Sequence, residues 1–302
     1  MYPTLLSSSS NLEVAISREI RTNQTAAAFV ASLLDKEETE MTQTEFKPLK
    51  LPMLTEFRTI CIDNFKKQGV VFEKHMQYKD FLTSPSMESV RQAVSSRIGL
   101  RKPLDAKTFK ILFRGCAFGH AIFNSDAWCA VFSNQELRLI EMLEDLDDYF
   151  GDAYGRNFNS KVPCSLGLDV ADKFIEQMKE TGEKKSFLRF SHAGAIKPFA
   201  SFLGLYDLLN SNLGENHGKC KASADMESRE WRSSLISPFS ANFAFVLYKC
   251  NDQFKVLTRL QETPVRLPRC PPNSYLCPLD QFTSIMERIP RSQCSHDNLC
   301  RI

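Results

Sequence analysis

One histidine of the chain follows a strand-like segment at a place where α/β proteins commonly hold ligands. The apolar run Ser186–Ser191 predicts a buried strand, and His192-Ala193-Gly194 follows it directly. A helix is predicted from about Ile196 to Leu209, with Pro198 in its first turn, where proline is tolerated. In open α/β sheets, ligands bind where a strand ends and the next helix begins. His192 is therefore the leading candidate for a functional side chain; the alternative is a loop histidine without a role.

Other polar groups carry weaker signals. Lys184, Lys185 and Lys197 flank the same strand and could attract a polyanion, although ordinary surface lysines are the simpler account. Lys197 is close enough in sequence to His192 to reach the same phosphate. His217-x-x-Cys220 could be half of a metal site, but no second pair accompanies it, so a solvated loop is favoured. We therefore predict no metal site and no cofactor.

The segments that would position these residues divide into two patterns. Helical periodicity dominates from Leu51 to about Tyr154. Strand patterns lie on both sides of this stretch, at Glu13–Ile16, Ser186–Ser191, and Asn242–Cys250 with its hairpin partner Phe254–Leu260. The chain is therefore predicted to have helices in its middle and strands near both ends.

Two helix starts are predicted from capping residues. Ser17 should cap a helix that runs to about Leu34. Ser133-Asn134-Gln135-Glu136 is a capping box, which should open a further helix. The acidic residues of that second helix should face solvent; they are Glu144, Asp145, Asp147 and Asp148.

Length and charge exclude several classes of protein. The 302 residues are enough for a sizeable core. The 38 basic and 36 acidic residues give a net charge of +2, so the chain has no basic surplus typical of nucleic-acid binding. Its longest apolar runs are Ala26–Leu34, which is broken by Ser32, and Phe243–Tyr248, and both are too short to cross a bilayer.

The cysteine content favours an oxidising compartment. An even number of cysteines is spread along the chain without a C-x-x-C pair, and the alternative is a set of buried free thiols. Asn23-Gln24-Thr25 is an N-glycosylation sequon, so Asn23 is a predicted glycosylation site. Met1–Thr4 has neither the basic nor the apolar region of a signal peptide, and we therefore expect the front of the protein to be missing. The ten cysteines are Cys61, Cys116, Cys129, Cys164, Cys220, Cys250, Cys270, Cys277, Cys294 and Cys300.

The segment around His192 resembles a known motif. Leu188–Leu205 is similar to the strand–HAE–helix motif of the multiple inositol polyphosphate phosphatases, the animal phytase-like branch of the histidine acid phosphatases. Four further blocks of the chain resemble that family and extend the likeness over nearly the whole chain: Ile20–Leu33, Ala127–Phe132, Asp145–Gly155 and Trp231–Cys250.

The resemblance implies a fold. It predicts an α/β domain of residues 1–35 and 158–302, with a mixed sheet flanked by helices, and an inserted all-helical domain of residues 36–157. It also leads us to expect that the N-terminal part of the α/β domain is missing.

The resemblance also implies a chemistry, the two-step hydrolysis of phosphomonoesters. In the family, a histidine of an R-H-G-x-R-x-P motif attacks phosphorus, and arginines clamp the phosphoryl oxygens. A second histidine, from the HAE motif, binds the phosphate. The acidic residue of that motif protonates the leaving alkoxide.

This chain departs from the family pattern at each of these points except one. It has no R-H-G-x-R-x-P among its five histidines, and the acid position of the HAE motif is Gly194. The family arginine that precedes the first helix corresponds to Ala15; Arg18 and Arg21 follow it. The resemblance therefore assigns phosphate binding to His192, with Lys197, Arg21 and Arg18 as candidate substrate-binding residues.

Two functions follow from the resemblance. By family, the protein hydrolyses inositol polyphosphates such as phytate through a phosphohistidine. The alternative is an inactive pseudophosphatase, or a truncated form, that binds phosphorylated ligands or a protein partner. The chain as printed is expected to be inactive, because nucleophile and general acid are lacking. The expected partners are inositol polyphosphates or other phosphomonoesters, not nucleic acid.

The resemblance further implies a compartment and a disulfide. The family and the cysteine content predict the endoplasmic reticulum lumen or secretion. Cys294 and Cys300 match a cysteine pair of the family in spacing and position, so a Cys294–Cys300 disulfide is expected.

Overall fold

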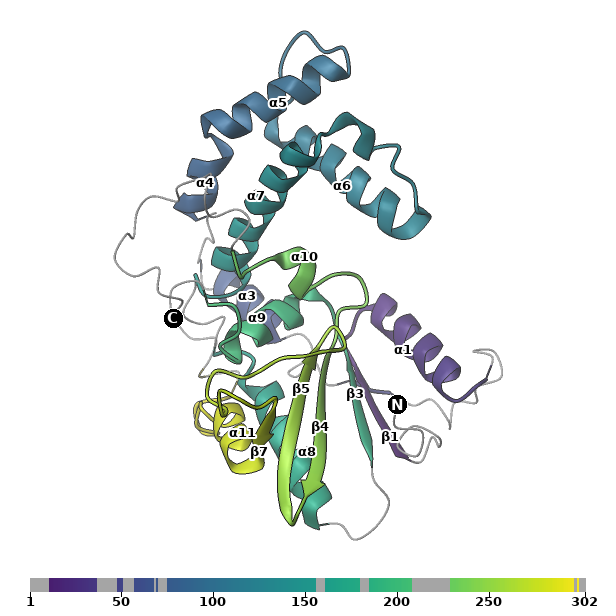
Figure 1. The fold of residues 1–302 in the computed structure, drawn as a ribbon, viewed down its shortest axis with the longest axis vertical. Helices are drawn as coiled ribbons and strands as arrows, with labels where there is room; N and C mark the ends of the chain where they lie inside the picture. Colours follow the sequence, from purple (N-terminus) through teal and green to yellow (C-terminus); the bar gives the residue numbers. More distant parts are fainter. Residues whose placement is uncertain are drawn as a thin grey trace. The chain divides into compact units, whose positions relative to one another are not determined.

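The computed structural model describes residues 11–36, 48–50, 57–67, 69, 75–155, 161–179, 185–207, 229–295 and 298 (Figure 1). The chain forms two compact units. The α/β unit comprises Met1–Val71, Asn157–Leu205 and Ala241–Ile302, and the helical unit comprises Phe72–Arg156 and Tyr206–Ser240.

The first sheet of the α/β unit is parallel and has β1 in its middle. Strand β1 (Leu12–Ile16) pairs on one side with β2 (Leu49–Lys50) and on the other with β3 (Ser186–Phe190). The register of β1 and β3 runs from Leu12 opposite Ser186 to Ile16 opposite Phe190. The predicted strands at both ends of the chain are thus confirmed, and two of them lie side by side although far apart in sequence.

The second sheet is antiparallel and built on a hairpin. Strand β4 (Phe243–Cys250) pairs along its whole length with β5 (Gln253–Leu260). Asn251 and Asp252, both with positive φ, form the two-residue turn, as the right-handed twist of a hairpin requires. This confirms the predicted hairpin.

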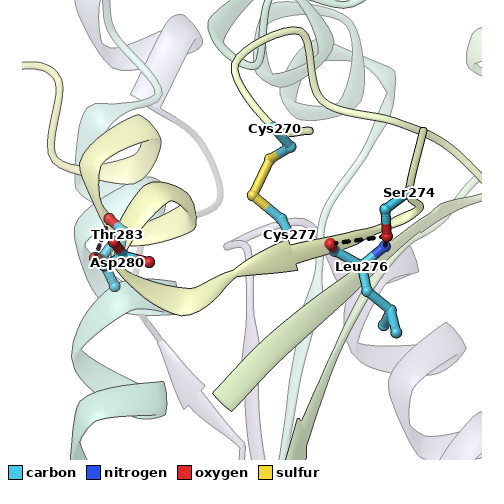
Figure 2. The surroundings of a disulfide bond; sticks show 6 residues. All are labelled: Cys270, Ser274, Leu276, Cys277, Asp280 and Thr283. Atoms are coloured by element: carbon cyan, nitrogen blue, oxygen red, sulfur yellow. Dashed lines mark hydrogen bonds between the residues drawn. A yellow bond between two sulfur atoms is a disulfide. The ribbon is translucent and has the colours of Figure 1, made fainter. Parts of the chain in front are cut away.

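Two short strands extend the second sheet from β5. These are β6 (Thr263–Pro264) and β7 (Leu276–Pro278). A disulfide between Cys270 and Cys277 closes the segment that leads into β7 (Figure 2). In the same segment, the Ser274 hydroxyl accepts a hydrogen bond from the Leu276 N–H and donates one to its carbonyl.

Helices pack on these strands through aromatic side chains. Helix α1 (Ile20–Leu33) places Phe29 against Phe190 of β3, with ring centres 5.6 Å apart. Phe199 contacts Phe243 and Phe245 of β4. Phe282 contacts both Phe245 and Phe174. The helices that carry Phe199, Phe282 and Phe174 are α9 (Ala193–Phe202), α11 (Leu279–Met286) and α8 (Cys164–Lys179); α3 (Phe57–Lys67) completes the helices of this unit in the part of the chain that the structure describes.

The helical unit surrounds an apolar core of its own. Its largest fully buried side chains include Phe109, Met87, Ile140 and Leu143. The capping box is confirmed, because the Ser133 hydroxyl accepts from the Glu136 N–H while the Glu136 carboxylate accepts from the Ser133 N–H. The unit's helices are α4 (Met76–Leu82), α5 (Pro85–Arg97), α6 (Ala106–Phe123), the 3-10 turn η4 (Cys129–Val131), α7 (Asn134–Asp152) and α10 (Ser233–Ile236).

The prediction of a solvated acidic face on α7 is wrong for Asp145. This side chain is only 4% exposed. It accepts hydrogen bonds from Arg229 Nε (2.6 Å) and from the Ser233 N–H (2.7 Å). Burial raises its pKa in spite of these hydrogen bonds. A distant segment of the chain therefore turns this residue inward.

The same segment explains how the compact units differ from the predicted division. Arg229 and Arg232 both bind the carboxylate of Glu141 on α7. Residues Tyr206–Ser240 accordingly belong to the helical unit, whereas the prediction assigned them to the α/β domain. Residues up to Val71 belong to the α/β unit.

The predicted Cys294–Cys300 disulfide is wrong, because Cys294 bonds Cys164 at the start of α8. The reason is the packing of the tail. Helix α11 packs on α8, and beyond it Arg291 makes a bidentate pair with Asp172 of α8 (2.9 and 2.6 Å). The tail thus lies along α8, which brings Cys294 to Cys164. Cys300 lies outside the described residues.

The other cysteines mostly bear out the prediction of disulfides. Cys116 bonds Cys129, and Cys61 is also disulfide-bonded. Cys250 is a free thiol.

We predict that the chain self-associates through its edge strands. Among the described strands, β3 pairs only with β1 and β4 only with β5. Every residue of β3 and all but Lys249 of β4 are half-buried, so apolar side chains stay partly accessible along both strands. Apolar strands at the edge of a sheet tend to pair with another chain. Light scattering should detect association that grows with protein concentration.

A charged edge should weaken that association. Val246 and Leu247 are successive residues of β4, so their side chains face opposite sides of the sheet. At least one of the substitutions Val246→Lys and Leu247→Lys should therefore shift the chain towards monomer. Tyr275→Lys, at an exposed position off both edges, is the control. A monomer at every concentration would contradict the prediction.

We also predict that the two disulfides of the α/β unit differ in their effect on stability. Cys164–Cys294 spans 130 residues and Cys270–Cys277 spans 7. In the chain-entropy treatment, the first stabilises by about 5 kcal/mol and the second by about 2 kcal/mol. Urea unfolding of the two paired Cys→Ala variants measures the difference, and the reverse order of stabilities would refute the account.

Candidate functional site

The candidate site lies at the edge of the first sheet where β1 and β3 end. Because the two strands are parallel, their last residues, Ile16 and Phe190, lie opposite each other. The Ser17 N–H donates to the Phe190 carbonyl (3.1 Å) and continues the pairing by one residue. Helices α1 and α9 begin shortly after this edge, at Ile20 and Ala193. The positive ends of two helix dipoles therefore follow the same sheet edge, which favours anions.

Both helix starts differ from the prediction. Ser17 is not the cap of α1, because the cap position is Glu19 and the Ser17 hydroxyl instead hydrogen-bonds that of Thr22 (2.7 Å). Helix α9 begins at Ala193 rather than at Ile196, so Pro198 lies inside the helix and not in its first turn. The earlier start makes His192 itself the cap residue of α9.

A cluster of charges holds β1, β3 and α8 together below this edge. Arg189 of β3 donates to Glu13 of β1 (2.7 Å) and to Asp169 of α8 (2.9 Å through Nε). Lys173 of α8 donates to Glu13 (3.0 Å). Sequence reasoning missed this cluster, although one signal was present: an arginine within an otherwise apolar strand requires a buried partner.

The pKa values in this cluster reflect the pairing. Burial alone would raise the pKa of Glu13, but hydrogen bonds from Lys173 and Arg189 outweigh it and hold that pKa below its ordinary value. Burial would lower the pKa of Lys173, and its hydrogen bond with Glu13 outweighs that effect and raises the pKa. Glu13, Lys173 and Arg189 are thus charged at neutral pH, and their pairing holds the two strands and α8 in place.

His192 folds back over the start of its own helix. Its Nδ1 accepts a hydrogen bond from the Gly194 N–H (3.2 Å). In the neutral ring, the proton must then be on Nε2, which is a hydrogen-bond donor. The close approach depends on glycine, since a Cβ at position 194 would lie 2.9 Å from both Nδ1 and Cε1 of the ring.

The other predicted site residues occupy different environments. Lys197 lies one turn along α9 and is 8% exposed. Arg18 and Arg21 are exposed near the start of α1, and Arg21 pairs with Glu19 (3.3 Å). Ala15 is completely buried within β1. His192 and Lys197 thus belong to α9 and its cap, Arg18 and Arg21 lie at the start of α1, and both helices begin after the same sheet edge.

Several predictions concern residues elsewhere. Lys184, His217 and Cys220 lie outside the described residues. Asn23 is exposed on α1, within its sequon, and its glycosylation stays a prediction. Among the residues that the structure describes, no group of three His, Cys, Asp or Glu side chains could hold a metal ion, and no helix is long and apolar enough to span a membrane.

An α/β unit with a histidine between a parallel strand and the next helix is the arrangement that the sequence resemblance predicts. The profile of the histidine phosphatase superfamily, branch 2, matches residues 1–267. The chain belongs to this superfamily.

Curated relatives agree with this assignment. The chain is similar to multiple inositol polyphosphate phosphatase 1 of Gallus gallus, with 26% identity in an alignment of 281 residues that covers 87% of this chain and 60% of the relative. It is also similar to the Homo sapiens protein of the same name, with 30% identity in an alignment of 195 residues that covers 60% of this chain and 39% of the relative. The chain thus spans less than two thirds of the length of either relative.

A solved structure agrees in fold. The multiple inositol polyphosphate phosphatase of Bifidobacterium longum, in complex with inositol hexasulfate, superposes with a TM-score of 0.68 at 14% identity. The match covers 94% of this chain and 74% of that one. The predicted α/β fold of the histidine acid phosphatase type is thereby confirmed.

We predict that Gly194→Ala displaces the His192 ring. The added Cβ would lie 2.9 Å from two ring atoms, so the ring must turn and lose the hydrogen bond from residue 194. Proton–nitrogen correlation spectra of the imidazole should show the Nε2-protonated form in the parent chain, and a mixture of both neutral forms in the variant.

Gly151→Ala on α7 is the matched control, because its Cβ would meet nothing within 4 Å. An alanine gains up to about 1 kcal/mol over glycine inside a helix. Thermal melts should show a larger gain in stability for Gly151→Ala than for Gly194→Ala. Equal gains in stability, together with an unchanged spectrum of the His192 imidazole, would contradict the role of His192 as the cap of α9.

Proposed function

We propose that this chain binds phosphomonoesters, and inositol polyphosphates in particular, at the edge where β1 and β3 end. The observation that carries the proposal is the position of His192, which caps α9 directly after a parallel strand. The names of the relatives, and the inositol hexasulfate bound by the Bifidobacterium longum protein, support the ligand class.

Each candidate group would contribute a different interaction. The Nε2–H of His192 would donate to a phosphate oxygen, while the Gly194 N–H keeps the ring oriented through Nδ1. The dipole of α9 would favour the negative charge. Lys197, Arg18 and Arg21 would add positive charge, and guanidinium groups suit phosphate because they can donate two parallel hydrogen bonds.

We further propose that these 302 residues bind without hydrolysing. The printed sequence contains no Arg-His-Gly, and position 194 has no proton to give to a leaving alkoxide. General acid catalysis contributes about 10²–10⁴-fold in rate, so the loss of the acid alone would make an alkoxide leaving group slow.

A second candidate function is hydrolysis of inositol polyphosphates through a phosphohistidine. It is favoured by the match of residues 1–267 to the superfamily and by the relatives named as phosphatases. We place either function in the endoplasmic reticulum lumen or outside the cell, a proposal supported by the disulfides.

Calorimetry with inositol hexakisphosphate and inositol hexasulfate tests the binding. His192→Ala should weaken both ligands about tenfold or more, since a hydrogen bond to a charged group contributes about 1.5–3 kcal/mol. His120→Ala, on α6, is the control and should leave binding unchanged. Binding that is absent, or equal in the parent chain and His192→Ala, would refute the proposed site.

Phosphate release separates the two functions. The parent chain should release no more phosphate from inositol hexakisphosphate than His192→Ala does. Release that His192→Ala abolishes would establish hydrolysis by these residues and overturn the proposal of binding without turnover.

A further inference from the structure

One side of α6 in the helical unit carries large apolar side chains that remain exposed. Ile111, Phe118 and Ile122 are 58%, 49% and 57% exposed. At 100° per residue these three positions fall within about 40° of one another on the helix. They form a stripe about 16 Å long at 1.5 Å per residue.

Two aromatic side chains widen this stripe. Trp128 is 55% exposed and lies beside the helix, since a Cβ at Gly115 would be 3.5 Å from its Cγ. The Cys116–Cys129 disulfide ties the neighbour of Trp128 to α6. Phe239 is 61% exposed, and its ring lies 5.6 Å from that of Phe118. We call this set the α6 patch: Ile111, Phe118, Ile122, Trp128 and Phe239.

The side chains of the α6 patch do not belong to the apolar core of the helical unit. Helix α6 buries its opposite side through Phe109 and Cys116, which belong to the apolar core. Soluble monomers rarely leave large contiguous apolar patches in water without a binding role. An exposed apolar patch of this kind is typical of an interaction surface.

Charge identifies the kind of partner. Helix α6 contains Lys107, Lys110 and Arg114 and no Asp or Glu. Lys110 pairs with Glu144 of α7 (2.7 Å). Lys107 and Arg114 are exposed within about 60° of the apolar stripe. No carboxylate among the described residues forms an ion pair with either side chain.

These observations disfavour a second copy of the chain as the partner. A symmetric dimer would place the same surface on both sides of the interface, so the positive charges of Lys107 and Arg114 would face the same positive charges of the second copy. The surface instead suits a partner that is apolar and carries negative charge. An anionic lipid surface meets both requirements along the whole length of an exposed helix.

We infer that the α6 patch docks on an anionic lipid surface, in the leaflet that faces the lumen or the exterior in which we place the chain. The stripe enters the boundary between headgroups and acyl chains, and Trp128 lies at the level of the headgroups, where tryptophan is favoured. Lys107 and Arg114 contact the negative charges of the lipids. This binding is peripheral.

Sedimentation of the full chain with vesicles tests the inference. The chain should bind vesicles of phosphatidylcholine with phosphatidylserine more tightly than vesicles of phosphatidylcholine alone, and less tightly as salt rises. Phe118→Ser with Ile122→Ser should lower binding to both. Lys107→Ala with Arg114→Ala should lower it about 25-fold on the anionic vesicles only, since each basic residue contributes about fivefold there.

The controls lie on the α/β unit, at comparably exposed positions. Ile20→Ser removes an isoleucine that is 77% exposed, and Lys66→Ala with Lys67→Ala removes two exposed lysines. Both should bind vesicles as the parent chain does, and all variants should keep its circular dichroism.

Three results would overturn the inference. They are an absence of binding to anionic vesicles, an equal loss in the control variants, and self-association that Phe118→Ser with Ile122→Ser abolishes while Val246→Lys and Leu247→Lys do not. The last result would make a second copy of the chain the occupant of the α6 patch.

Discussion

The parallel pairing of β1 with β3 is the constraint on which the α/β unit depends. It joins segments more than 170 residues apart, as the Glu13–Arg189 hydrogen bond illustrates with a separation of 176. Arg189 is the group that makes the join specific, because its planar guanidinium reaches Glu13 on the neighbouring strand and Asp169 on α8 together. A lysine offers no such fork and could not hold both carboxylates in fixed directions.

The same charges make the arrangement sensitive to acid. Because the pKa of Glu13 is held below its ordinary value, its ionised form contributes stability above the pKa it has in the unfolded chain. That contribution is lost as the pH falls through the lowered pKa. The sheet edge that carries His192 is therefore fixed at neutral pH and is weakened once the pH falls below the ordinary pKa of a glutamate.

Local sequence patterns correctly predicted elements that are stabilised by interactions between neighbouring residues. The capping box at Ser133, the Asn251–Asp252 hairpin and the apolar strand before His192 all formed as expected, because neighbours in sequence provide the interactions. Two of the failures were long-range. Asp145 is buried by Arg229, 84 residues away, and Cys294 is taken by Cys164 because the tail packs on α8. Neither partner can be read from periodicity, since both depend on which helices meet in space.

For the candidate site, the sequence predicted that His192 follows a strand but not the hydrogen bond that its side chain makes. His192 could be placed at a strand end, whereas its hydrogen bond from Gly194 depends on a helix that starts three residues earlier than the pattern indicates. At two positions where we propose that the chain departs from the family chemistry, the observed residue suits the local packing. Ala15 fills a fully buried position where an arginine would need a charged partner, and Gly194 lets the histidine cap its helix, which a Cβ would obstruct. Residues that serve catalysis often cost stability, so a strand end that binds without turnover would be expected to carry these smaller residues.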